Sequence, residues 1–153
     1  MEIIENCKSE NSKIEIRKMI LEDLENISDI LYSDFDNFWS YDIFASELCC
    51  ENSLYFISVK NNEILGFAGF KKICDEAEIM NIVIRKSARG LGIGSLLLEY
   101  LLSEAHNIGV NVVHLEVDSN NFIAIRLYEK FGFRRVGFRK GYYGDDGAIL
   151  MEL

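Results

Sequence analysis

Three glycines stand at alternate positions directly before a leucine-rich run, and Arg89 precedes them in the stretch RGLGIG. Glycines 90, 92 and 94 at the entrance of a helix allow backbone N–H groups to converge on one anion, and the helix dipole adds to the attraction. A phosphate group is the natural ligand of such a loop. The spacing therefore predicts a phosphate-binding segment over residues 89–95.

Two common phosphate loops fit this segment poorly. A Walker loop requires Lys and then Ser or Thr after its last glycine, but Gly94 is followed by Ser95 and a leucine. The dinucleotide fingerprint GxGxxG requires Gly or Ala where the chain has Ser95 or Leu97. Glu116 stands about where a ribose-binding acid is expected, yet residues 85–89 separate the preceding strand from the first glycine. A dinucleotide site is the weaker alternative.

A third pattern fits, because Arg89, Gly92 and Gly94 form RxxGxG. This resembles the pyrophosphate loop of the GNAT superfamily of N-acetyltransferases, which bind acetyl-coenzyme A. The blocks MNIVI, RGLGIG, LEVDSNNFIAIRLYEKFGF and GYY also resemble, in order and separation, those of the bacterial ribosomal-protein-alanine N-acetyltransferases within it. The resemblance implies transfer of an acetyl group from acetyl-CoA, without a metal, to a primary amine. The N-terminal α-amine of a protein such as a ribosomal protein is the implied acceptor.

The same resemblance implies a cofactor site built from three segments. The backbone of a strand would pair with the pantetheine arm, the glycine loop would bind the diphosphate, and an asparagine would bond to the arm. The implied residues are Ile82, Val83, Ile84, Arg89, Gly90, Leu91, Gly92, Ile93, Gly94, Ser95 and Asn121. From the residues alone, Asn120 or Asn121 is equally suited to cap a helix.

Two catalytic roles follow from the resemblance. Glu116 matches the general base, acting through water, and an α-amine of pKa about 7.7–8.0 needs only a weak base. Tyr128 matches the general acid that faces the departing sulfur. A phenol of pKa about 10 is a poor proton source for a thiolate of about 8.5, by about 2 kcal/mol, so we expect Tyr128 to donate a strong hydrogen bond or to shuttle a proton. Without the resemblance, Glu116 is interpreted as a solvated carboxylate and Tyr128 as a buried aromatic residue.

The residues that are expected to bind the acceptor amine match the family pattern least well. Tyr142 and Tyr143 resemble a tyrosine pair that lines the acceptor path, and Trp39 lies in a segment FWS that resembles a Pro-Trp-Ser segment. The chain lacks that proline, and its turn GDDGA after the tyrosines is shorter than in the family. A small-molecule amine or a lysine side chain is therefore an alternative acceptor. A non-catalytic acyl-CoA-binding module is the alternative from another class.

The elements that must position these residues follow from the hydrophobic pattern. We expect strands at 13–19, 54–60, 63–73, 77–84, 110–117, 134–143 and 148–153, and helices at 21–35, 41–51, 93–108 and 122–131. The order predicts one α/β (α+β) domain over residues 13–153, with a mixed sheet of about seven strands flanked by about four helices. Residues 1–12 are expected to form a flexible tail.

Charge and cysteine content limit the class of protein. All of the net charge of −9 arises in residues 1–52, which hold 13 acids against 4 bases. This third is interpreted either as a solvated acidic face that aids solubility or as a surface that faces a basic partner. Nucleic acid is a disfavoured partner, since binding it requires a basic surface. The four cysteines show no zinc spacing, and no apolar run approaches the roughly 20 residues of a membrane span. We expect a cytoplasmic protein that binds neither metal nor membrane.

Overall fold

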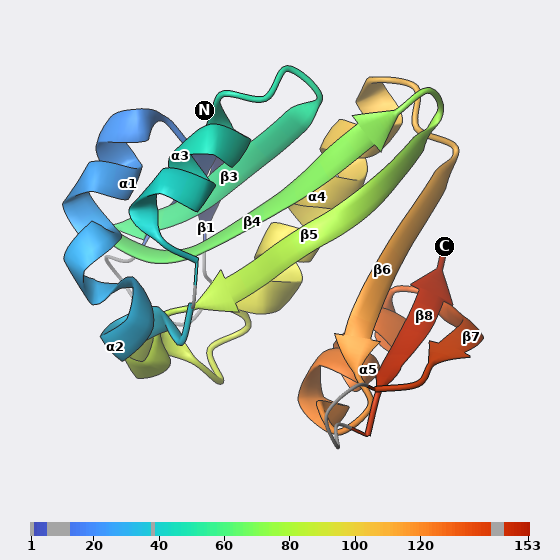
Figure 1. The fold of residues 1–153 in the computed structure, drawn as a ribbon. Helices are drawn as coiled ribbons and strands as arrows, with labels where there is room; N and C mark the ends of the chain where they lie inside the picture. The colour runs from blue at the N-terminus through green and yellow to red at the C-terminus, as the bar shows by residue number, and fades with distance from the viewer. Residues whose placement is uncertain (1, 6–12, 38, 142–145) are drawn as a thin grey trace.

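The computed structural model describes residues 2–5, 13–37, 39–141 and 146–153, and its strands form one sheet (Figure 1). The strand order is β1-β2-β3-β4-β5-β6-β8-β7, and every neighbouring pair is antiparallel except β5 and β6. The mixed sheet and single domain predicted from the sequence are confirmed. The strands are β1 (Glu2–Glu5), β2 (Lys13–Lys18), β3 (Ser53–Lys60), β4 (Glu63–Ile73), β5 (Glu76–Ile84), β6 (Val112–Asp118), β7 (Arg134–Arg139) and β8 (Ala148–Glu152).

Helices cover both faces of this sheet (Figure 1). On one face lie α1 (Leu21–Ile27), the 3₁₀ turn η1 (Ser28–Ile30), α2 (Leu31–Phe35) and α3 (Tyr41–Leu48). On the other lie α4 (Ile93–Asn107) and α5 (Phe122–Lys130), and a second 3₁₀ turn, η2 (Lys86–Ala88), precedes α4. Among the described residues, no helix is both long enough and apolar enough to cross a membrane.

Two apolar cores result from the alternation of side chains along the strands. The α4 core packs Leu97, Leu101 and Ile125 against residues such as Phe70 of β4. The α1–α3 core packs Phe35 and other residues of the first helices against the opposite face. Residues directly opposite each other on paired strands share a face, so each core is continuous across β3, β4 and β5.

Several elements end earlier than expected, such as α3 at Leu48 and β7 at Arg139, and two segments differ more from the sequence expectation. Residues 2–5, assigned above to a flexible tail, form β1 instead, because the free edge of β2 offers backbone hydrogen bonds to an extended segment. The helix expected over 21–35 is broken at η1, where the Ser28 hydroxyl donates to the Glu25 carbonyl and competes with regular helix bonding. The domain boundary at residue 13 stays a prediction.

The central strands β5 and β6 run side by side only at their beginnings. Their pairing covers 76–78 of β5 and 112–114 of β6, and beyond it the two strands diverge (Figure 1). A bulge contributes to this divergence, because the register with β4 passes from Ile79 to Asn81 and leaves Met80 as the extra residue. Such an insertion bends a strand and increases its twist. The second half of β5 therefore has an edge turned toward open space.

Candidate functional site

A cleft with a volume of about 670 Å³ lies between the second half of β5, the start of α4 and the start of α5. Its lining comes from residues 82–84, from the segment 88–95, from α5 and its N-cap, and from the end of α2. The lining is largely apolar, with polar groups gathered at the glycine segment. Such a cleft suits a long ligand that has one anionic end and one apolar end.

The structure brings nearly all of the predicted cofactor residues to this cleft. Ten of the eleven line it, the exception being Leu91, whose side chain is 64% exposed. Tyr128 lines it as well. Residues 82–84 stand on the free edge of β5, so their backbone groups on that side can pair with an extended ligand as a strand would.

The three glycines serve different purposes. Gly90 and Gly92 have φ of +79° and +83°, a backbone region that side-chain-bearing residues rarely adopt. Gly94 has no such requirement, and a Cβ there would lie 3.7 Å from a Leu127 methyl and 3.9 Å from Ile84. Its missing side chain instead keeps open the space between α4 and α5. The loop thus combines a backbone turn with an unobstructed approach to the helix.

The start of α4 supplies the donors for an anion. Gly92 is the N-cap of the helix, and the first intrahelical bond runs from Leu96 N–H to the Gly92 carbonyl. The N–H groups of the first turn therefore have no intrahelical acceptor and carry the positive end of the helix dipole. Arg89 adds a full positive charge at this end, and its Nε donates to the Ile84 carbonyl at 3.0 Å.

Asn121 plays the structural role that the sequence left open. Its Oδ1 accepts from the Ala124 N–H at 3.2 Å, which makes it the N-cap of α5. Its neighbour Asn120 donates to Asp146 at 2.6 Å. Asn121 also lines the cleft, so capping fixes the position from which its remaining polar groups can meet a ligand.

Tyr128 is a mostly buried phenol on α5. Its ring packs edge-on against Phe133 with centroids 5.7 Å apart, and the residue is 8% exposed. Removal from water disfavours the phenolate, and this burial raises the pKa of Tyr128 to about 12. The side chain is therefore a neutral hydrogen-bond donor at physiological pH.

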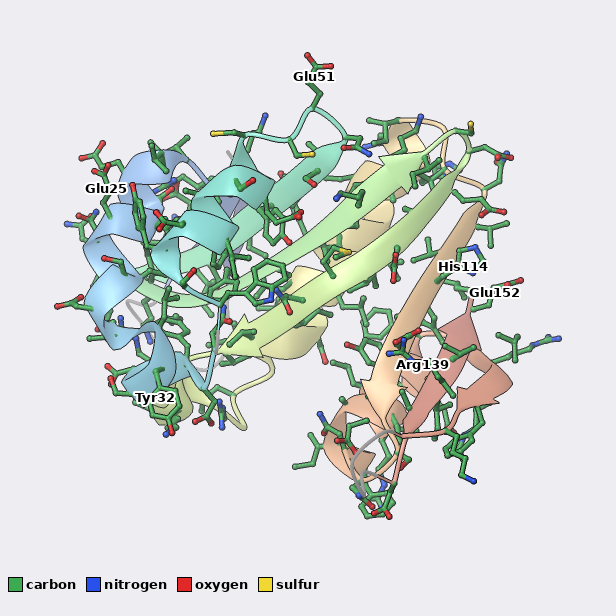
Figure 2. The ribbon with its side chains drawn as sticks, in the orientation of Figure 1. Glu25, Tyr32, Glu51, His114, Arg139 and Glu152 are labelled. Atoms are coloured by element: carbon green, nitrogen blue, oxygen red, sulfur yellow. The ribbon has the colours of Figure 1, made fainter. Side chains whose placement is uncertain are left out.

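Glu116 does not reach the cleft lining. Val117 and Leu115 of β6 point into the α4 core, which leaves Glu116 on the opposite, exposed face of the strand. There it accepts a 2.6 Å hydrogen bond from Arg139 of β7, the strand at the sheet edge (Figure 2). Arg139 stands 23 residues away, so no local sequence pattern pointed to it.

The predicted acceptor residues are only partly visible. Trp39 packs edge-on against Phe44, with ring centroids 5.6 Å apart, at the margin of the α1–α3 core. It therefore lies beside the helices of that face and outside the cleft lining. Tyr142 and Tyr143 lie outside the described residues. Trp39 and Glu116 thus lie on the same face of the sheet, the one that carries α1–α3.

Two lining residues at the end of α2 were missed by the sequence reasoning. Phe35 is buried in the α1–α3 core, and Asp36 follows it with its carboxylate against Lys86 and Arg89. No local pattern signals them, since they meet the glycine segment only through the fold. Leu127 and Ala124, also missed, share one helical face with Tyr128, and helical spacing could have found them.

Comparison with known proteins gives consistent results. Residues 24–133 match the model of the Acetyltransferase (GNAT) family. A Bacillus subtilis (strain 168) protein, provisionally named a ribosomal protein bS18-alanine N-acetyltransferase, is 34% identical over 144 residues, 92% of this chain and 95% of that protein. The ribosomal protein bS18-alanine N-acetyltransferase of Escherichia coli (strain K12) is 37% identical over 119 residues, 75% of this chain and 80% of its own.

The fold is shared with that class of protein as well. The crystal structure of the ribosomal-protein-S18-alanine N-acetyltransferase from Escherichia coli matches with a TM-score of 0.83 and 34% sequence identity. The match covers 92% of this chain and 92% of that chain. The similarity in fold therefore extends over nearly the whole of both chains.

Proposed function

The chain belongs to the acetyltransferase (GNAT) family, and from that premise we propose that it acetylates the N-terminal α-amine of a protein, with acetyl-CoA as donor. We propose further that the acceptor is a ribosomal protein with a basic N-terminal segment. The observation that carries the proposal is the cleft that joins the glycine loop, the free edge of β5 and Tyr128. We place this activity in the cytoplasm.

In this proposal, each part of the cleft binds one part of acetyl-CoA. The N–H groups at the start of α4, together with Arg89, bind the diphosphate. The backbone of residues 82–84 pairs with the pantetheine arm, and Asn121 bonds to the same arm from α5. A backbone N–H of β5 polarises the thioester carbonyl, so that the negative charge of the tetrahedral intermediate is stabilised.

The reaction forms a C–N bond and breaks the C–S bond of the thioester. The amine attacks as the neutral base, and its proton passes through water to Glu116, whose carboxylate Arg139 holds in place. Because α-amines have a pKa of about 7.7–8.0, a substantial neutral fraction exists before any catalysis. A carboxylate that acts through water is therefore a sufficient base.

The thiolate of coenzyme A leaves next to Tyr128. A phenol of pKa about 12 would lose about 5 kcal/mol in giving its proton to a thiolate of about 8.5. We therefore assign Tyr128 the role of a neutral hydrogen-bond donor that stabilises the developing thiolate. The released thiolate takes its proton from solvent.

A competition between acceptor types tests the proposal. Thiol release from acetyl-CoA is measured with a peptide that has a free N-terminal alanine, and with an N-terminally blocked peptide that contains lysine. A set of small primary amines forms the third arm. We expect turnover with the free N-terminus and at least about 10-fold lower kcat/KM with the other two, a difference typical of one missing specific interaction. Equal turnover of the blocked peptide, or turnover of small amines alone, contradicts the proposed acceptor.

A further inference from the structure

Asp36 occupies a backbone conformation that normally favours glycine. It follows α2 with φ of 55° and ψ of 31°, in the left-handed region. Its N–H donates to the Tyr32 carbonyl, and the N–H of Asn37 donates to the Leu31 carbonyl, so the two close the helix. Glycine is the usual residue at such a helix end, and Asp and Asn adopt this region more readily than other residues that carry a side chain. The conformation fixes the direction in which the Asp36 carboxylate leaves the end of α2.

The Asp36 carboxylate reaches two of the three cations in residues 85–89, the segment that leads into α4. Its Oδ1 lies 3.0 Å from Lys86 Nζ, and its Oδ2 accepts from Arg89 Nη2 at 3.1 Å. The hydrogen bond from Lys86, followed by that from Arg89, holds the pKa of Asp36 below its usual value. The carboxylate is thus charged at neutral pH and joins the end of α2 to the glycine loop.

The charges in the cleft are few. Among the described residues that line it, Asp36 is the single acid and Arg89 the single base. A diphosphate bound at the start of α4 would bring further negative charge to the donors that Asp36 already uses. Two anions that share the same cations weaken one another, because like charges repel and each donor is divided between them.

We propose that Asp36 is an internal anion that competes with the diphosphate of coenzyme A for Arg89, and so limits the affinity of the site. The inference rests on the proposed function, which puts the diphosphate at this loop. In the free protein Asp36 pairs with both Lys86 and Arg89. When the ligand binds, the diphosphate takes over the donors of Arg89. When free coenzyme A leaves, Asp36 recaptures Arg89 and shortens the lifetime of the product complex.

Calorimetry with coenzyme A tests the competition. Asp36→Asn removes the charge, and Asp36→Gly removes the side chain while suiting the left-handed backbone. We expect both variants to bind coenzyme A about 5-fold more tightly at low salt, the upper end of what one exposed ion pair contributes, with slower dissociation and a smaller gain at high salt. Asp29→Asn removes the same charge from an exposed position in η1 and should change the affinity less than about 2-fold.

Unchanged or weaker binding by both Asp36 variants would overturn the inference, because Asp36 would then orient Arg89 and not compete for it. Arg89→Ala separates this outcome from a failure of the proposed function. If Arg89→Ala weakens binding while the Asp36 variants do not tighten it, only the competition is wrong. If Arg89→Ala leaves the affinity unchanged, Arg89 does not bind the diphosphate and the competition is wrong. If Gly92→Val leaves it unchanged as well, the diphosphate does not lie at this loop and both statements fall. Competition also predicts that the gain from Asp36→Asn shrinks in the Arg89→Ala background.

Discussion

Tyr128 differs from an exposed tyrosine in a way that decides its chemistry. Burial of this side chain of α5 raises the pKa of Tyr128 to about 12. The neutral phenol is therefore the main form at every pH below that value. A group that stays protonated in this range cannot cause an inflection in the pH dependence of kcat near neutrality. Its effect must come from the hydrogen bond that it donates.

We expect Tyr128→Phe to lower kcat by about 100-fold, the effect of losing one hydrogen-bond donor to a developing negative charge, with little change in the affinity for coenzyme A. The phenyl ring retains the packing on Phe133, so the variant isolates the hydroxyl. Between about pH 6 and pH 9 the kcat profiles of wild type and variant should run parallel, because the same acceptor amine titrates in both. A near-normal kcat in the variant removes Tyr128 from the mechanism. An inflection present only in the wild type contradicts a phenol that stays neutral.

At the scale of elements, the start of α4 depends on one backbone geometry. Gly92 has φ of +83°, and a Cβ built there would meet nothing within 4 Å in the protein. Strain in the backbone and obstruction of an approaching ligand are therefore the two effects of a side chain at this position. Gly109, at the other end of α4, has φ of +86° and an equally open environment, but it lies outside the cleft.

This pair of glycines allows the two effects to be separated. Gly92→Val and Gly109→Val should each lower the free energy of unfolding by about 1–2 kcal/mol, the cost of a left-handed conformation with a side chain. Urea denaturation measures that loss. Only Gly92→Val should also abolish detectable binding of coenzyme A in calorimetry. Retained affinity in Gly92→Val, or its loss in both variants, contradicts the assignment of the loop to the diphosphate.

At the scale of the whole molecule, negative charge gathers on one side of the sheet. Residues 21–48, which contain α1–α3, hold eight acids and no Lys or Arg, and Glu25 and Glu51 extend into solvent around these helices (Figure 2). On the same face of the sheet, Glu116 of β6 is paired with Arg139, so this part of the surface adds little to the negative charge. His114 lies between Glu76 and Glu152 on this face, at 3.2 and 3.3 Å.

If the acceptor peptide binds beside the acidic helices α1–α3, we expect the protein to prefer peptides with basic residues. With the N-terminal alanine kept, kcat/KM should be higher for peptides with Arg or Lys at the second to fifth positions than for peptides with Asp or Glu, by about 10-fold or more at low salt. The difference should decrease at about 0.5 M salt, because exposed charges are screened. Equal rates for the two series at low salt would exclude electrostatic selection of the acceptor.

Local sequence was sufficient to predict much of the fold and most of the residues that line the cleft. Alternate glycines before a leucine-rich run specify a turn and a helix start within a few residues, and the alternation along the strands specifies which side chains enter a core. For this reason the single mixed sheet was predicted correctly. Ten of the eleven predicted cofactor residues indeed lie in one cleft. These features depend on backbone conformations that neighbouring residues impose on one another.

Only the tertiary structure decided the features that join distant segments. Asp36 and Arg89 are 53 residues apart, Arg139 and Glu116 are 23 apart, and neither pair belongs to a periodic pattern. The separation of β5 from β6, which opens the cleft, likewise depends on the bulge at Met80 and on what packs against each strand. Sequence alone thus determined where the chain turns and which residues are apolar. Packing determined which charged side chains form ion pairs. Electrostatic attraction has no preferred direction, so each charge pairs with whichever opposite charge the fold places close to it.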